Sequence, residues 1–160
     1  MRGSVTTPLA VLIVISAIAA APPASEGASA RSATARAYYK AAVQGSADAQ
    51  ARLGALYVKG DGVTQSDATA FQWLLRSADQ GHPRAQLMLS EAWANGRGVP
   101  RNNTIAYNWA YLAQTNAPDQ DIRDQAAALL TALTRRMSAA EIDEAKQWAA
   151  TWKPRLENGA

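Results

Sequence analysis

Cysteine is absent from the sequence, and histidine occurs only once, as His82. Without cysteine, the chain has no disulfide framework and no cysteine near its N-terminus that a lipid anchor could modify. Metal sites and acid-base sites need several converging side chains, and His82 has no evident partner for either. We therefore interpret His82 as a helix cap or a surface residue, and we predict no metal, no cofactor and no catalytic residue.

Clustered charge is also missing. The chain carries 16 basic and 13 acidic residues, for a net charge of +3, and Arg135 and Arg136 are the only adjacent basic residues. Nucleic-acid-binding proteins usually show a basic stripe, so we predict no nucleic-acid partner. Asp119, Asp121 and Asp124 lack the glycine and the spacing of a calcium loop. At the start of a helix they instead complement the helix dipole.

The longest apolar run covers residues 9–21, which is shorter than the roughly 20 residues that a transmembrane helix needs. Arg2 gives the segment the positive start of a secretory signal peptide. We predict a signal peptide over residues 1–30, cleaved after Ala30. Cleavage after Ala19 is the second choice, and an uncleaved N-terminal anchor is the alternative. Export without disulfides favours a periplasmic or secreted protein that has no stable membrane insertion after cleavage.

The sequence repeats itself after 36 residues. A period of about 20 to 50 residues is typical of arrays whose units are too small to bury their own apolar faces and therefore stack on one another. The recurring residues are Gln44, Gly45, Ala49, Gln50, Leu53, Gly60, Gly62, Val63, Ala70 and Trp73, which return as Gln80, Gly81, Ala85, Gln86, Leu89, Gly96, Gly98, Val99, Ala106 and Trp109.

Each unit contains two amphipathic segments and a glycine loop. In the first unit, apolar residues recur at three- and four-residue spacing over residues 46–59, and a second stripe follows over residues 70–78. The loop between them, residues 60–63, and its counterpart, residues 96–99, both read Gly-x-Gly-Val. Such a loop is too short to cradle a phosphate, but its glycines supply the positive φ that ends a helix. Each unit is thus predicted to be an antiparallel helical hairpin.

This pattern resembles the Sel1-like repeat, a relative of the tetratricopeptide repeat. The resemblance covers two units over residues 46–117, preceded by a half unit over residues 38–45. It implies an all-α fold: an αα-hairpin solenoid of about two repeats with a flanking N-terminal helix and a C-terminal helical cap. In the second unit, Ser90 replaces the close-packing glycine found at Gly54. The residues that carry the resemblance are Ala49, Gln50, Leu53, Gly54, Tyr57, Gly60, Gly62, Val63, Asp67, Ala70, Trp73, Ala78, Gln80 and Gly81.

The predicted cap follows the second unit. Residues 118–136 favour one helix, and Ser138 with Glu141 reads as a capping box that opens a last helix ending near Lys153, before Pro154. The end of a solenoid needs such a cover with a polar outer side. The predicted domain organisation is a signal peptide over 1–30 and one Sel1-like repeat domain over 31–157, divided into a helix 31–45, a repeat 46–81, a repeat 82–117 and a cap 118–157.

The resemblance implies a protein-interaction adaptor rather than an enzyme. Such a solenoid binds a partner protein through its concave face, and export points to an envelope or sensor protein as the partner. One alternative is a component that binds or assembles envelope polysaccharide or cell wall. A second is a hydrolase like the cysteine-rich Sel1-like proteins that bind or cleave β-lactams. The sequence has no cysteine and no Ser-x-x-Lys nucleophile motif to support that second alternative.

In related tetratricopeptide hairpins the first helix of each pair lines the concave face, so we place the candidate partner-binding residues there. Leu87 is apolar at a position that the packing pattern does not require, which is typical of an anchor inside a polar rim. The alternative is that these positions are ordinary solvated helix surface. The predicted residues are Asp48, Ala51, Ala55, Val58, Lys59, Arg84, Leu87, Glu91, Ala94 and Asn95.

Overall fold

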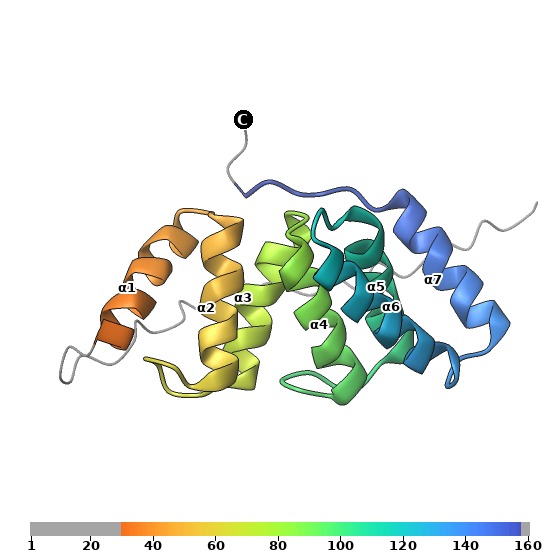
Figure 1. Ribbon diagram of the computed structural model, residues 1–160, viewed down its shortest axis with the longest axis horizontal. Coiled ribbons are helices and arrows are strands. Elements are labelled where there is room, and N and C mark those ends of the chain that lie inside the picture. The colour runs from red at the N-terminus through yellow and green to blue at the C-terminus, as the bar shows by residue number, and fades with distance from the viewer. Residues whose placement is uncertain (1–29, 158–160) are drawn as a thin grey trace, which may run out of the picture.

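The computed structural model of the protein describes residues 30–157, which form α-helices and no strands (Figure 1). This confirms the predicted all-α solenoid. The predicted signal peptide, residues 1–30, lies outside the described residues except for Ala30. No helix within the described part of the chain is long and apolar enough to cross a membrane. The helices are α1 (Ala30–Val43), α2 (Ala47–Lys59), α3 (Asp67–Asp79), α4 (Pro83–Asn95), α5 (Asn103–Asn116), α6 (Gln120–Thr134) and α7 (Ala139–Thr151).

Successive helices form a row of hairpins. Helices α2 and α3 make the first hairpin, and α4 and α5 make the second, while α1 packs on α2 and α3 packs on α4. The short turns that join α1 to α2, α3 to α4 and α5 to α6 lie along one edge of the row, which we call the turn edge. The two glycine loops lie along the opposite edge, which we call the loop edge (Figure 1).

Side chains at the helix starts satisfy backbone donors that would otherwise lack partners. Ser46 Oγ accepts a hydrogen bond of 3.3 Å from the Ala49 N–H, and at the same place in the next repeat His82 Nδ1 accepts one of 3.3 Å from the Ala85 N–H. The structure therefore confirms His82 as a helix cap. The α7 capping box that begins at Ser138 is also present.

The glycine loops join each repeat to the one before it. A Cβ atom added to Gly62 would lie 2.5 Å from the backbone oxygen of Arg31, so only glycine allows this approach. Gly98 approaches the backbone of Asp67 in the same way. An ion pair accompanies each contact: Asp61 with Arg31 at 3.6 Å, and Arg97 with Asp67 at 3.3 Å. The two pairs occupy equivalent positions with their charges exchanged.

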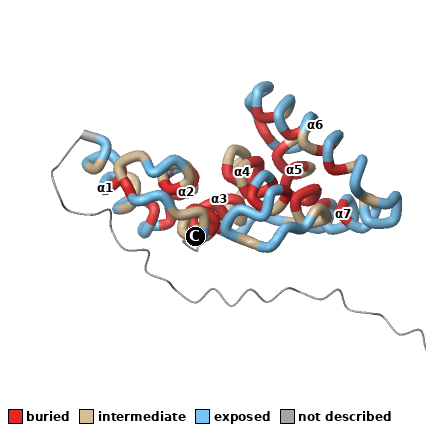
Figure 2. The backbone as a smooth tube through the Cα atoms, turned by 90° about the horizontal axis from the view of Figure 1, so that it is seen from below, coloured by how far each residue is buried: buried red, intermediate tan, exposed pale blue. Residues whose placement is uncertain are grey.

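The repeated tryptophans lie in the core. Trp73 is 3% exposed and Trp109 is 5% exposed. Trp109 also makes edge-to-face contacts with Trp148 and Trp152 of the C-terminal segment, at centroid distances of 5.6 and 6.1 Å. Buried positions gather where the hairpins face one another (Figure 2). Removing a buried ring of this size costs about 3 to 5 kcal/mol, so these residues carry a large part of the stability.

The predicted cap continues the repeat register. The N-caps of the second helices are Ser66, Asn102 and Ser138, so α7 begins one full period after α5. Helix α6 packs on α5, as the first helix of a third unit would, and also on α4. Helix α7 packs mainly along α5, and side chains of α6 and α7 share one core cluster. Helix α6 begins at Gln120 rather than at residue 118, because Asp119 caps it by accepting from the Asp121 N–H at 2.8 Å.

Candidate protein-binding groove

Most of the predicted partner-binding residues are at least partly exposed, and three are not. The exposed or half-buried ones lie on α2 and α4: Asp48, Ala55, Val58, Lys59, Arg84, Glu91 and Asn95. Ala51, Leu87 and Ala94 are buried and present no surface to a partner.

Leu87 corrects the expectation of an open apolar anchor. It is 1% exposed, and it packs in one cluster with Ala113, Ile122 and Ala126. Ile122 and Ala126 belong to α6, which covers this side of α4. Ala94 lies in a cluster that contains residues of α6 and α7, and Ala51 lies in one that contains residues of α4. These positions form the contacts between successive units, which is why they are apolar.

The surface that remains follows a different stripe of the same helices. On α4 the stripe is Arg84, Met88, Glu91 and Asn95, and on α2 it is Asp48, Arg52, Ala55 and Lys59, one period earlier. Residues spaced in this way lie on one face of a helix. Sequence reasoning missed Arg52 and Met88, although the three- and four-residue spacing from Asp48 and Arg84 reaches both. These stripes border a surface that lies between α2 and α6. We call this surface the groove.

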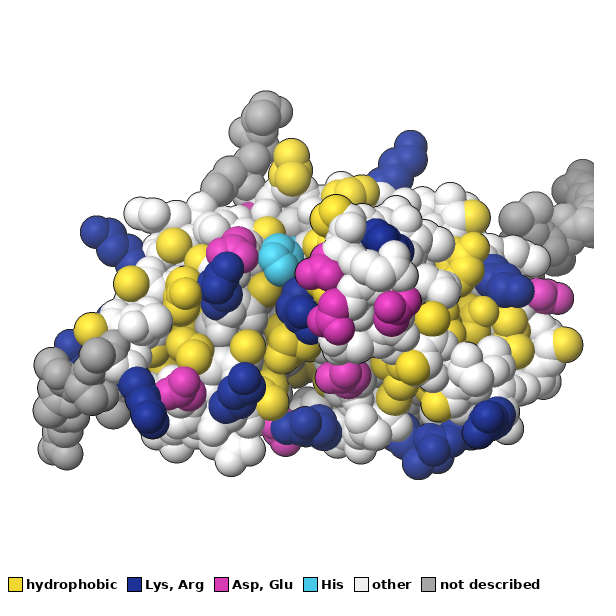
Figure 3. All heavy atoms as spheres, viewed as in Figure 1, with side chains coloured by type: hydrophobic (Ala, Val, Ile, Leu, Met, Phe, Trp, Pro, Cys, Tyr) yellow, Lys and Arg dark blue, Asp and Glu magenta, His cyan; other side chains and the backbone are white. Residues whose placement is uncertain are grey.

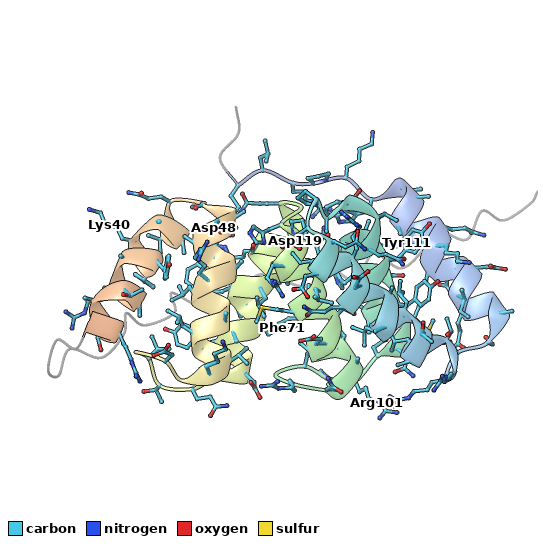
Figure 4. All side chains as sticks on the ribbon, viewed as in Figure 1. Lys40, Asp48, Phe71, Arg101, Tyr111 and Asp119 are labelled. Carbon is cyan, nitrogen blue, oxygen red and sulfur yellow. The ribbon has the colours of Figure 1, made fainter. Side chains whose placement is uncertain are left out.

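The floor of the groove is apolar. A depression of ≈ 30 Å³ lies between α2, α3 and α4, with Val58, Phe71, Leu74 and Met88 among its lining residues. Figure 3 shows hydrophobic surface between α2 and α6 with charged side chains of both signs beside it, and Figure 4 places Phe71 near the middle of the molecule. That volume holds about two water molecules and not a bound metabolite.

Paired charges form the end of the groove at the turn edge. Arg52 Nε donates to Asp48 Oδ2 at 2.7 Å, and His82 Nε2 lies 3.6 Å from Asp48 Oδ1. The hydrogen bond from Arg52 lowers the pKa of Asp48, while burial lowers the pKa of His82. Across the groove, Arg84 pairs with Asp121 of α6 at 3.5 Å. Figure 4 shows Asp48 and the α6 cap residue Asp119 toward this edge.

Glu91 is the exception among the acidic residues of the groove. It borders the depression beside Met88 and Ala92, but it has no hydrogen bond or ion pair with any described residue. Desolvation by its neighbours raises the pKa of the Glu91 carboxyl, although the residue as a whole remains exposed, and the charges of Arg97, which lines the same depression, and of Arg84 lower it. A carboxylate above an apolar floor can receive the charged end of a lysine or arginine whose stem lies on that floor.

The remaining chemistry of the described residues is limited. Within residues 30–157, no group of three or more His, Cys, Asp or Glu side chains converges as a metal site would require. The groove presents charged side chains beside an apolar depression. Such a surface is suited to a polypeptide segment.

This architecture defines the molecule as an αα-hairpin repeat protein with an open groove. Its sequence matches the Sel1 repeat at residues 47–82 and again at residues 83–113. Residues 47–113 therefore form two Sel1 repeats, and repeats of this family serve as protein-interaction scaffolds.

Solved structures agree with this fold. One is a protective antigen present in uropathogenic Escherichia coli strains, described as displaying an SLR fold, with a TM-score of 0.67 and 24% identity over 79% of this chain and 30% of that one. Another is a Sel1 repeat protein from Oxalobacter formigenes, with a TM-score of 0.56 and 24% identity over 79% of this chain and 49% of that one. The chain thus spans less than half the length of either protein. No curated protein matches it.

Proposed function

We propose that the groove binds a segment of a partner protein in the cell envelope, and that Glu91 receives a basic side chain of that segment. The observation that carries the proposal is the unpaired Glu91 carboxylate beside the apolar depression. Asp48 and Asp121, by contrast, already have basic partners within the chain. A basic partner residue would place its stem against Val58 and Met88 and its charge at Glu91, which offsets the desolvation of that carboxylate.

Site-specific photo-crosslinking tests the proposal and identifies the partner. A photoreactive residue at Met88 should trap one envelope protein in living cells, whereas the same residue at Lys146 on α7 should not. Binding of the purified partner is then measured with Glu91→Lys and with Glu144→Lys, which makes the same charge change at an exposed position of α7. We expect Glu91→Lys to weaken binding at least about tenfold, which corresponds to about 1.4 kcal/mol. Equal affinity of both variants would place the partner elsewhere.

Export is the second part of the proposal, and the apolar run at residues 9–21 supports it. A fusion of residues 1–40 to a reporter that is active only outside the cytoplasm should be active. Mass spectrometry of the protein purified from its native source should find a chain that begins at Arg31. A chain that begins at Ala20 would keep export and change the cleavage site. A chain that begins at Met1 and sediments with membranes would indicate an anchor instead.

A further inference from the structure

The chain continues past the end of α7 and does not remain beside that helix. Residues 152–157 turn back along the turn edge and pass over the α3–α4 turn toward α2 (Figure 1). The backbone N–H of Arg155 donates to the carbonyl oxygen of Asp79 at 2.7 Å. Gly81, with a φ of +89°, leaves room for this path, because a Cβ atom there would lie 3.3 Å from Pro154 Cγ. We call residues 152–157 the tail.

The tail places the Glu157 carboxylate among hydrogen-bond donors of the first repeat. Glu157 accepts from Arg76 Nε at 2.7 Å and from Arg76 Nη2 at 3.0 Å, and also from Gln50 Nε2 at 2.8 Å. A two-point contact from arginine together with a third donor is specific for a planar carboxylate. Gln50 and Arg76 belong to α2 and α3, so the first hairpin alone supplies all three bonds.

The donors are held in place by contacts that do not involve the tail. Gln50 is fully buried, and its Nε2 also donates to the Ala42 carbonyl oxygen at 3.0 Å, while its Oε1 accepts from Gln80 Nε2 at 2.8 Å. The Arg76 guanidinium lies 5.1 Å from the centroid of the Trp73 ring. If the carboxylate leaves, one N–H of a buried amide loses its partner, which is unfavourable. The site is therefore prearranged to hold a carboxylate.

The tail itself is held lightly. Leu156 is 67% exposed, and Lys153, Pro154 and Arg155 are also exposed. Trp152 packs on Trp109 of the core, but beyond it apolar burial contributes little to docking of the tail, which there depends on Glu157 and the Arg155 backbone bond. The second repeat has no such site: the counterpart of Arg76 is Leu112, which lies in a core cluster with Ala149 of α7. The carboxylate site is thus a property of the first repeat alone.

We propose that Gln50, Arg76 and Gln80 form a receptor site for an extended, carboxylate-bearing protein segment, that Glu157 occupies it in cis, and that an acidic segment of a partner displaces the tail. This site lies on the turn edge and is independent of the groove at Glu91. A tethered tail has an effective concentration on the order of 1 mM, so a free segment must compete with it. Loss of the Glu157 carboxylate should therefore open the site to segments added in solution.

Peptide binding to the full chain tests this. The probe is a fluorescein-labelled peptide, Lys-Pro-Arg-Leu-Glu-Asn-Gly-Ala, followed by fluorescence anisotropy. We expect the Glu157→Gln chain to bind it at least tenfold more tightly than the wild type does. The matched control Glu144→Gln should bind it as weakly as the wild type does. Replacing Glu by Gln in the peptide, or adding Arg76→Gln to the Glu157→Gln chain, should weaken binding at least tenfold. The peptide change leaves the protein untouched, so folding cannot explain its effect.

Side-chain amide resonances report the cis contact directly. In ¹⁵N-labelled protein, the Gln50 side-chain NH₂ signals should shift in Glu157→Gln and stay unchanged in Glu144→Gln. Peptide binding that ignores the Glu to Gln change would overturn the carboxylate site. Gln50 signals that do not move in Glu157→Gln would overturn occupancy by the tail. A wild-type dimer that dissociates in Glu157→Gln would assign the tail to a second copy and would overturn the cis arrangement.

Discussion

Ser90 donates a hydrogen bond of 2.6 Å to the backbone carbonyl oxygen of Ala106. The same place in the first repeat is Gly54, where an added Cβ atom would lie 2.7 Å from Cγ of Leu74. The second repeat has Ala110 where the first has Leu74. In the first repeat the smaller residue, Gly54, lies on the first helix and the larger one, Leu74, on the second. In the second repeat the larger residue, Ser90, lies on the first helix and the smaller one, Ala110, on the second.

This exchange predicts that Gly54→Ser alone destabilises the protein by about 1 to 3 kcal/mol, because the new side chain meets Leu74. Leu74→Ala alone should cost about 2 to 5 kcal/mol. The double variant copies the second repeat, so we expect it to be more stable than the sum of the single effects predicts, by about 0.5 to 3 kcal/mol. Urea unfolding measures all three. Strict additivity would show that the two positions do not interact.

The aromatic contacts of the core predict a contrast between two tryptophans. Trp109→Ala should cost about 3 to 5 kcal/mol, since the ring is buried between the second hairpin and the C-terminal segment. Trp148 is 39% exposed, so Trp148→Ala should cost clearly less, near the average of about 1 kcal/mol for a point substitution. Chemical unfolding of both variants checks the order, which a loss below about 1 kcal/mol for Trp109→Ala would contradict.

The cap at His82 predicts loss of stability in mild acid. Burial lowers the pKa of His82 below its usual value of about 6.5, and the Asp48 carboxylate only partly opposes this. Below pH 6.5 the unfolded chain therefore binds a proton that the folded chain does not, so stability falls as the pH drops from about 6.5 toward the folded pKa. His82→Ser restores the cap type of Ser46 without a titrating ring. Its melting temperature should fall less than that of the wild type between pH 7 and pH 5.

Asp79 predicts a pH dependence of stability opposite to that of His82: its contribution falls as the pH rises. It is the last residue of α3, where a negative charge opposes the helix dipole. Burial raises the pKa of its carboxyl, and Glu157 raises it further, against a lowering by Arg155. Protonated Asp79 therefore favours folding, and this stability is lost as the pH rises through the folded pKa. At pH 7, Asp79→Asn should stabilise the protein by about 0.3 to 1 kcal/mol, and the gain should shrink in acid. Asp143→Asn on α7 is the matched control and should change little.

Much of the fold was predictable because it depends on local signals. Glycine loops and N-caps such as Ser46 act over a few residues, and the repeat supplies each of them twice, while the single capping box at Ser138 is equally local. The third unit was harder to see, because α6 and α7 keep the register while losing the repeated residues. The 36-residue period is visible in the N-caps of α3, α5 and α7, which are Ser66, Asn102 and Ser138.

The binding surfaces were less predictable because they depend on contacts between distant parts of the chain. Leu87 looks unneeded within its own hairpin, and only the position of α6 makes it a core residue. The tail joins Glu157 to Arg76 and Gln50, which are 81 and 107 positions away in sequence. Gln50 recurs in the repeat as Gln86, but Arg76 and Glu157 belong to no repeated pattern, so no spacing rule finds the contact.

The exchanged ion pairs at the loop edge determine how this array can grow. Asp61 contacts Arg31 and Arg97 contacts Asp67, so each loop matches the helix start that precedes it. A tandem copy of residues 46–81 inserted after the original would set a second Asp61 against Asp67, like charge against like. Lengthening the protein by duplication therefore requires a compensating charge change. The ion pairs between neighbouring units favour one linear order of those units.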